Sequence, residues 1–392
     1  MPLPPPGSPR LMKHADYTVG WICALPIEKA VAEVALDVRH DPLSQPSKDS
    51  NNYSLGSIGA HNVVIACLPA GVIGTSSAAA VAIHMLSTFC GIKFGLMVGI
   101  GGGVPGGEKD IRLGDVVVST PVRTFGGVVQ YDLGKTVEDG LFIRTGSSNK
   151  PPAVLLSAVS SLRAKQLKED VNLATRWCEL ALKCPKLQET TIYPGTEHDQ
   201  LFEAEYDHQG GGLTCELCDV SRSLPRPVRS SEEPEIHYGL IASGNQVIKN
   251  GSMRESFRKE LHMLCFEMEA AGLMDNFPCL VIRGICDYAD SHKNKRWQPY
   301  AAATAAAYAT ELLQTIPGSD VSDIRPVVDQ DLESKVTGKK AKSLGRVWSP
   351  EEDNSLKIAT STKPLDWAHA SLILGNRSPF ACQKRFEKLV GA

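Results

Sequence analysis

The sequence lacks long hydrophobic runs. It contains no stretch of about 18 consecutive apolar residues, which is the shortest length at which a helix is expected to cross a membrane. The N-terminal segment MPLPPPGSPR is rich in proline and has no apolar stretch of the kind found in secretory signals. We therefore expect no membrane partner and a location in the cytoplasm, the nucleus or both.

An excess of charge of one sign is also missing, and so is a disulfide pattern. The formal net charge is -3, so any basic surface that contacts nucleic acid must be local. The chain has 11 cysteines, an odd number, and several lie in apolar runs, as Cys67, Cys265 and Cys279 do. This distribution is typical of free thiols in a reducing compartment.

What is present is an alternation of β-rich and helical segments. It predicts an α/β domain of three layers with a mixed or parallel central sheet. Residues 265–277 are expected to run from a strand end into a helix. The other expected strands lie at 17–25, 53–58, 62–68, 94–104, 114–122, 237–244 and 279–290, and the other expected helices at 26–37, 74–89, 151–165, 170–182, 252–264 and 297–316.

Composition predicts how the chain is divided. The main domain is interrupted by a polar insertion, and a polar linker joins it to a small all-α unit of three helices. We expect a disordered leader at 1–15, the main domain at 16–316, the insertion at 185–235, the linker at 317–345 and the small unit at 346–392.

Polar residues and glycines follow several of the expected strands. In open α/β sheets, ligands bind at the carboxyl ends of strands, where glycines let them approach the backbone. Each group alone has an ordinary interpretation as a helix cap, a first-turn charge or a tight turn. The groups are Glu28, a glycine-rich turn at Gly99–Gly103, the pair Glu267 and Glu269, and the pair Asp287 and Asp290.

The order of these motifs along the chain is more specific than any one of them alone. GWICALPIEKA, VGIGGGVPGGEKDIRLGDVVVS, HYGLIASGNQVIKNG, FEMEAAG and ICDYAD follow one another between residues 17 and 315. Together they resemble the nucleoside phosphorylase/methylthioadenosine nucleosidase superfamily, with Cys286 in place of the motif's serine. CFEMEAAGLM and PGTEHDQLF are closer to the phosphorylase-like domain of fungal NLR-type receptors. Some relatives of that branch are nucleotide-directed nucleosidases, including ones that act on ATP.

The resemblance implies catalytic roles for three acids. Asp287 would be the general acid at purine N7, Glu28 would hold the attacking water, and Glu269 would bind the ribose hydroxyls. Met268 would lie along the sugar, and Val247 and Ile248 would contact the base. The full set of substrate-binding residues near the glycines is expected to be Gly99, Ile100, Gly101, Gly102, Val247, Ile248, Glu267 and Met268.

The residues near the glycines favour water over phosphate as the nucleophile. Phosphorylases of the family bind phosphate with arginines near this turn and a Ser or Thr within it, but here the positions hold Met97 and Ile100. A carboxylate at Glu28 would repel phosphate. Arg112 and Arg123 are cations that keep phosphorolysis open as the alternative.

The resemblance predicts the type of base, and the arginines of the insertion predict the 5′ group of the substrate. The resemblance places an aspartate, Asp287, where adenine-directed members have one, which favours an adenine compound. Arg222, Arg226 and Arg229 of the insertion are expected to pair with a nucleotide's phosphates if the insertion folds over the 5′ side of the substrate. The alternative is a solvated basic loop. Arg112 is also expected among the substrate-binding residues.

The insertion also has the spacing of a zinc site. His198, His208, Cys215 and Cys218 form the pattern H-x9-H-x6-C-x2-C, which suits a tetrahedral ion, and His237 is a second choice of histidine. Such zinc would be structural, and we expect no cofactor for catalysis. Unrelated thiols and histidines are the alternative.

The last part of the chain resembles a Myb/SANT repeat. Trp348, Trp367 and Phe386 recur at equal spacing, as the core aromatics of a three-helix unit do. The alternative to DNA binding is a protein-interaction module. The third helix of such units enters the major groove. The residues expected to face DNA are Gln383, Lys384, Arg385 and Lys388.

We therefore expect a purine N-ribosidase that hydrolyses an adenine nucleoside or nucleotide to free base and ribose or ribose phosphate. The alternatives are a phosphate-dependent phosphorylase and a catalytically silent nucleotide sensor that signals through the Myb-like tail. A sensor would not need a water-positioning acid and a leaving-group acid together. Members of the resembled family assemble into oligomers, so we expect a homo-oligomer.

Overall fold

The computed structural model describes residues 12–107, 109–169, 172–210, 214–329 and 349–359, together with residues 383, 385, 386 and 389. The chain divides into two compact units, Met1–Gln330 and Asp331–Ala392. Within these described residues, we find no helix that combines the length and the apolar character needed to cross a membrane.

The first unit is built on a sheet of 11 strands in its described part. The main path runs in the order β10-β6-β13-β5-β1-β4-β3-β2, and β7, β11 and β12 branch from it. The strands are β1 (Val19–Cys23), β2 (Val38–His40), β3 (Tyr53–Ile58), β4 (His61–Cys67), β5 (Phe94–Gly103), β6 (Val116–Ser119), β7 (Val128–Gln130), β10 (Ile236–Gly239), β11 (Ile241–Ser243), β12 (Cys265–Glu267) and β13 (Cys279–Asp287), with a separate hairpin of β8 (Gly134–Thr136) and β9 (Phe142–Arg144).

The sheet is mixed. Its centre is parallel, because β1 pairs with β4 and β5, and β5 pairs with β13, in the same direction. Strand β6 runs antiparallel to β13, and β12 runs antiparallel to β5. Every residue of β1 and β13 is buried, as expected for strands that are covered on both faces.

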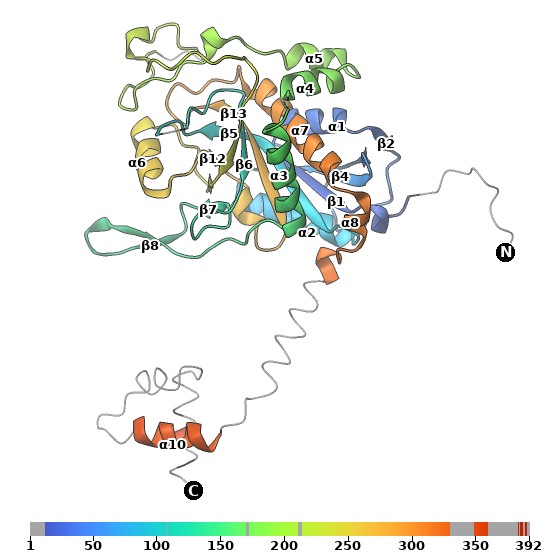
Figure 1. The fold of residues 1–392 in the computed structure, drawn as a ribbon, viewed down its shortest axis with the longest axis vertical. Coiled ribbons are helices and arrows are strands. Elements are labelled where there is room, and N and C mark those ends of the chain that lie inside the picture. Colours follow the sequence, from blue (N-terminus) through green and yellow to red (C-terminus); the bar gives the residue numbers. More distant parts are fainter. Residues whose placement is uncertain are drawn as a thin grey trace, which may run out of the picture. The chain divides into compact units, whose positions relative to one another are not determined.

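Helices cover both faces of this sheet, and Figure 1 shows the long helix α7 lying along it. One hydrophobic cluster joins the sheet to α1, α3, α4 and α7, and a second joins it to α2. The predicted three-layer α/β fold is therefore confirmed. The helices are α1 (Pro26–Val34), α2 (Thr75–Thr88), α3 (Ala153–Gln166), α4 (Leu173–Ala181), α5 (Pro185–Thr190), α6 (Gly251–Leu261), α7 (Gln298–Thr315) and α8 (Gly318–Ser322), with 3-10 turns at His14–Asp16, Glu138–Gly140, Thr196–His198, Val220–Arg222 and Ala270–Gly272.

Two sequence expectations about local structure were wrong. The glycines Gly99–Gly103 form the end of strand β5 and not a turn. The segment after β12 makes only the 3-10 turn Ala270–Gly272 and not a longer helix.

The predicted linker also begins too early. Val321 and Val327 are buried in the two hydrophobic clusters of the first unit, and the Val327 N–H donates to the carbonyl of Ile92 at 2.8 Å. The chain therefore stays part of this unit beyond residue 316, because these two apolar side chains extend its core.

In the second unit, α10 (Pro350–Ala359) carries the buried Leu356. The Arg385 guanidinium donates two hydrogen bonds to the Asp353 carboxylate, at 2.8 and 2.6 Å. Such a two-point pair fixes Arg385 against the helix. Trp348 and Trp367 lie outside the described residues.

Candidate active site

Strand register brings the acidic motifs together at the end of β5. Asp287 at the end of β13 pairs in register with Gly102. Phe266, just before Glu267 in β12, is opposite Gly102 from the other side. The neighbouring β1 leads directly into α1, whose first turn contains Glu28. Acids that are far apart in sequence thus meet at the carboxyl ends of the central strands.

The glycines of β5 leave room for these acids. A Cβ atom on Gly99 would lie 2.5 Å from Glu28 Oε1, and one on Gly102 would lie 2.8 Å from Asp287 Oδ1. A side chain at either position would displace a carboxylate. The glycines are therefore required by close approach of side chains, and not by an unusual turn.

A cavity of about 230 Å³ opens in front of the glycines. Its mouth includes Ile73 and Val247, which remain about half exposed. The lining contains most of the predicted site and several residues that were not predicted. Of the predicted substrate-binding residues near the glycines, Gly99 is not in the lining. The lining includes Glu28, Ile100, Gly101, Gly102, Val247, Ile248, Glu267, Met268, Glu269, Arg283, Asp287 and Lys293.

Glu28 is almost fully buried and held by backbone donors. Its carboxylate accepts N–H groups from Ala24 at 2.7 Å and Leu25 at 3.0 Å, and from Ile100 at 2.8 Å. Burial raises the pKa of Glu28, and it outweighs the lowering effects of Arg283 and of these N–H groups. A carboxylate with a raised pKa is a better proton acceptor for a bound water.

Glu267 and Glu269 share one buried guanidinium, that of Arg283, which is 1% exposed. Arg283 Nη2 donates to Glu267 and lies 3.4 Å from Glu269 Oε2. Glu267 also accepts the N–H groups of Glu269 and Ala270, so it is committed to holding the turn. Glu269 accepts the N–H of Met268 at 3.4 Å and is also hydrogen-bonded by the Gly74 backbone. Its side chain lines the cavity.

The environment of Glu269 changes its acidity. Burial raises its pKa, Arg283 opposes this, and the neighbouring Glu267 and Glu28 raise it further, to about 7. Glu269 therefore changes its charge near neutral pH, where many enzymes work.

Asp287 is 5% exposed and has three partners. Its Oδ1 accepts the N–H of Ala289 at 2.9 Å, in a turn where Ala289 adopts a φ of 52°. Its Oδ2 lies 3.1 Å from the Cys286 thiol and 3.1 Å from Lys293 Nζ. Burial lowers the pKa of Lys293, but Asp287 and Cys286 outweigh it and raise that pKa overall. The ammonium group is therefore a fixed positive charge beside Asp287.

Sequence reasoning missed Arg283 and Lys293. The signal for Arg283 was present, since it is the only charge inside the apolar segment CLVIRGIC. Such a residue must have charged partners when the strand is buried. Lys293 gave no such signal, because it stands in the polar stretch SHKNK, where any lysine reads as solvent-exposed.

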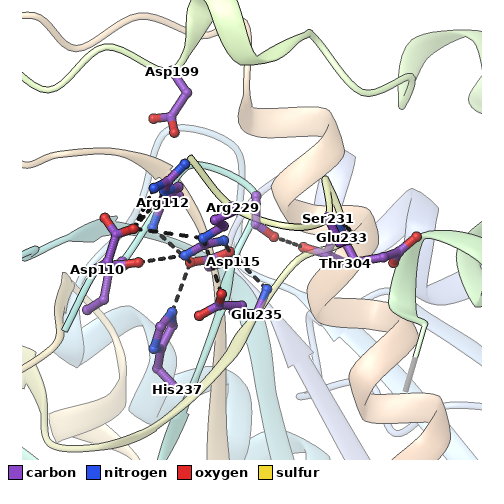
Figure 2. Close-up of polar contacts among 12 residues, drawn as sticks. Asp110, Arg112, Asp115, Asp199, Arg229, Ser231, Glu233, Glu235, His237 and Thr304 are labelled. Carbon is purple, nitrogen blue, oxygen red and sulfur yellow. Dashed lines mark hydrogen bonds and ion pairs between the residues drawn. The ribbon is translucent and has the colours of Figure 1, made fainter. Parts of the chain in front are cut away.

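The four arginines predicted to bind the substrate are absent from the residues that line this cavity, and each pairs with an acid elsewhere. Figure 2 shows Arg229 and His237 pointing toward Asp115, with Arg112 at Asp110. Arg229 donates to both Asp115 oxygens at 2.7 Å. The ion pairs are Arg112 with Asp110, Arg222 with Glu203, Arg226 with Asp199 and Arg229 with Asp115. Arg229 thus joins the insertion to the rest of the domain, whereas Arg222 and Arg226 pair with acids of the insertion itself.

The zinc pattern comes together in part. His208, Cys215 and Cys218 place one potential ligand atom each within 4.8 Å of one another. His198 is outside this group, and its Nε2 lies 3.6 Å from Glu197. His237 is paired with Asp115 at 2.8 Å, which removes it as the second choice of histidine.

Of the residues expected to face DNA, Arg385 forms the pair with Asp353 described above. Gln383 is described and has a partner of its own. Lys384 and Lys388 lie outside the described residues.

Comparison with known proteins gives two family matches. Residues 18–315 match the model of the phosphorylase superfamily. Residues 348–391 match the model of the Myb-like DNA-binding domain. The chain therefore carries a Myb-like domain at its C-terminal end.

Three relatives match the first unit, and two of them are nucleosidases. A nucleotide-binding leucine-rich repeat (NLR)-like protein from Hyaloscypha variabilis is 51% identical over 76% of this chain and 29% of its own length. A 5'-methylthioadenosine/S-adenosylhomocysteine nucleosidase from Mycobacterium bovis is 25% identical over 76% of this chain and 97% of its own. The ATP nucleosidase Cap17 of Escherichia coli is 24% identical over 75% of this chain and 50% of its own. The chain spans less than a third of the NLR-like protein and half of Cap17.

The fold is also found in solved structures. Futalosine hydrolase of Helicobacter pylori superposes with a TM-score of 0.50 at 16% identity, and the match covers 77% of this chain and 99% of that one. At this identity the likeness concerns the fold.

Proposed function

The chain belongs to the phosphorylase superfamily, and on that premise we propose that its first unit hydrolyses the N-glycosidic bond of a purine nucleoside or nucleotide. The products would be the free base and ribose or ribose phosphate. The observation that carries the proposal is the meeting of Glu28, Glu269 and Asp287 around one cavity. Each of these acids has different partners, as separate catalytic tasks require.

Asp287 acts as the acid. The bond between C1′ and the base nitrogen breaks, its electron pair goes to the purine, and a proton from Asp287 is placed on N7. Lys293 at 3.1 Å then neutralises the Asp287 carboxylate that remains. Lys293 thereby assists departure of the base without itself donating the proton.

Glu28 acts on the water. A water oxygen forms the new bond to C1′ and gives a proton to Glu28, whose raised pKa suits it to accept one. Glu269 hydrogen-bonds the ribose hydroxyls and stabilises the positive charge that develops on the sugar. Solvent then removes the proton from Glu28 and reprotonates Asp287, which returns both groups to their starting states.

The contacts around the glycines support water over phosphate. An incoming anion would need the Ile100 N–H or a free cation, but that N–H already donates to Glu28. The Arg283 guanidinium is taken up by Glu267 and Glu269. Arg112 pairs with Asp110, and neither Arg112 nor Arg123 is among the cavity residues. A phosphate there would meet carboxylates.

We propose an adenine compound as the substrate, on the basis of Asp287 as the acid at N7. An adenine nucleotide such as ATP is the finer proposal, supported by the relation to an ATP nucleosidase. The arginines of the insertion lend it no support, because all three are paired with acids.

We also propose that the Myb-like domain binds DNA and that the protein works at least partly in the nucleus. The basic residues Lys384 and Lys388 in its last predicted helix support this. The family model that matches this region describes a DNA-binding domain.

The test is base release by the purified full chain. Protein would be incubated with ATP, AMP, adenosine, methylthioadenosine and inosine, and free base measured by chromatography. We expect adenine from at least one adenine compound, and a loss of about 100-fold or more in Asp287→Ala. A higher rate with ATP than with adenosine would support the nucleotide. No base from any of these compounds would overturn the proposal.

A further inference from the structure

The insertion contains a compact group of sulfur and nitrogen ligands whose function the reaction does not require. His208, Cys215 and Cys218 supply three atoms within 4.8 Å of one another, and Cys218 is buried. Around one zinc ion, sulfur and nitrogen ligands lie about 2.0–2.3 Å from the metal. Their mutual distances then fall within about 4 Å, so a small closure of these side chains fits them to one ion.

Two of these side chains, His208 and Cys218, are oriented by a second contact. One His208 nitrogen, Nε2, is 3.0 Å from the carbonyl of Thr214, which leaves Nδ1 for a metal. The Cys218 sulfur accepts the N–H of Gln209 at 3.5 Å. An N–H donor of this kind stabilises a thiolate, the form in which cysteine binds zinc.

An independent observation points to a fourth ligand. His292 is 7% exposed, yet neither of its ring nitrogens makes a hydrogen bond. Its ring centre is 5.6 Å from that of His208, and the Cys215 sulfur is 4.0 Å from its carbonyl oxygen. Its Nδ1 lies 3.7 Å from Asp290. Buried polar nitrogens are rarely left without a partner, so this ring is expected to bind one.

We propose that His208, Cys215, Cys218 and His292 bind one structural Zn²⁺ ion. The choice of ion follows from the ligand set, since two thiolates and two imidazoles favour tetrahedral zinc. Asp290 then holds the His292 ring through Nδ1, as carboxylates commonly do for histidines bound to zinc. The site replaces His198 of the sequence pattern with a histidine from a distant part of the chain.

The position of His292 gives the ion a mechanical role. His292 follows β13 on the same short segment as Asp287 and Lys293, whereas the other ligands belong to the insertion. Ser291 reinforces the join, since its hydroxyl oxygen accepts the His208 N–H at 3.0 Å and donates to Asp207 at 3.1 Å. Zinc therefore ties the insertion to the segment that presents the proposed general acid.

The full chain, purified from cells grown with added zinc, should contain about one zinc ion per chain by elemental mass spectrometry. Replacement by Co²⁺ should give the strong visible and near-ultraviolet bands of a tetrahedral thiolate site. These bands test the wild-type protein and need no variant to fold. Cys218→Ser should lose the metal, and His292→Asn should weaken binding and alter the cobalt spectrum.

Two matched controls should keep zinc unchanged: Cys178→Ser, an exposed thiol on α4, and His198→Ala, a histidine of the same insertion. Circular dichroism of every variant separates loss of metal from loss of fold. Wild-type protein without zinc and without cobalt bands would overturn the proposal, as would a disulfide between Cys215 and Cys218. An equal loss of zinc in His198→Ala would also overturn it.

Discussion

At the scale of single residues, three carboxyl groups share one cavity but differ in their partners. Glu28 accepts three backbone N–H groups, Glu269 faces Arg283, and Asp287 lies between Ala289 and Lys293. Identical chemistry in different surroundings gives different acidity. In the proposed mechanism, Glu28 accepts the proton of the water, Glu269 stabilises positive charge on the sugar and Asp287 protonates the base.

Glu269 should give the activity a pH dependence near neutrality. Its pKa is raised to about 7, and only its ionised form stabilises a cationic sugar. We expect kcat/KM to rise with pH through about 7 and then level off. In Glu269→Gln the residual activity should not show this rise of kcat/KM with pH. A rise at the same pH in the variant would show that another group is responsible.

The same shift predicts a change in stability of known sign. A carboxyl whose folded pKa lies above its ordinary value of 4.5 stabilises the fold below that value, and the contribution is lost as pH rises through about 7. Wild type should therefore lose stability relative to Glu269→Gln over this window. Urea unfolding at several pH values would measure the difference, and a constant difference would contradict the assignment.

Lys293 should affect turnover more than binding. Its ammonium stabilises the Asp287 carboxylate after proton transfer, so Lys293→Met should lower kcat about 10- to 100-fold and change KM little. Arg296→Ala is the matched control, because Arg296 is exposed and is not among the residues that line the cavity in front of the glycines. Steady-state kinetics on both variants would decide. An unchanged kcat in Lys293→Met would remove Lys293 from the mechanism.

How far the site could be read from the sequence depends on whether a residue's partners are local. Glu28, Glu269 and Asp287 follow apolar strands, and motif order together with strand ends places them at one sheet edge. The arginines of the insertion were assigned to phosphate because their partners, such as Asp199 and Asp115, are set only by tertiary contacts. His292, the proposed fourth zinc ligand, was missed for the same reason.

At the scale of elements, the site depends on close packing between β13 and α7. A Cβ atom on Gly284 would lie 1.8 Å from the carbonyl oxygen of Ala301. Because this oxygen belongs to the helix backbone, it cannot move aside as a flexible side chain can. The alanine-rich face of α7 gives the helix this close approach to the sheet. The strand that ends in Asp287 is thereby fixed along its length.

Gly284→Ala should therefore destabilise the protein by at least about 3 kcal/mol, the upper range for an overpacked core. Gly71→Ala is the control: its Cβ would meet open space, and its φ of +77° costs about 1–2 kcal/mol. Thermal or urea unfolding would compare them. Equal losses would mean that α7 can move away from β13 and that this packing does not fix the site.

The elements themselves were largely predictable, because strand and helix periodicities are local. The exceptions have tertiary causes. The glycines of β5 look like a turn in sequence, but β12 and β13 pair with them and make them strand. Residues after 316 look like a linker because they are polar, yet two buried valines hold them to the core.

At the scale of the whole molecule, two units with different chemistry occur on one chain. The Myb-like domain should bind duplex DNA through its basic last helix, whose lysines neutralise backbone phosphates. Combined Lys384→Ala and Lys388→Ala should weaken binding and reduce the slope of log affinity against log salt by about 0.9 for each phosphate that the variant no longer neutralises. Fluorescence anisotropy at several salt concentrations measures both.

Arg385 provides a contrast within the same predicted helix. Because it is paired with Asp353, Arg385→Ala should act by destabilising the small unit. Lys135→Ala, on the exposed β8, is the control for general charge. No DNA binding at any salt would favour the protein-interaction alternative.

The central claim is that water, and not phosphate, attacks the sugar. The most direct measurement is ³¹P spectroscopy of a reaction that contains substrate, enzyme and excess phosphate, with base release followed in parallel. The account predicts release at a rate independent of phosphate, no ribose 1-phosphate, and a strong loss of activity in Glu28→Gln. Accumulation of ribose 1-phosphate, with release that requires phosphate, would contradict it.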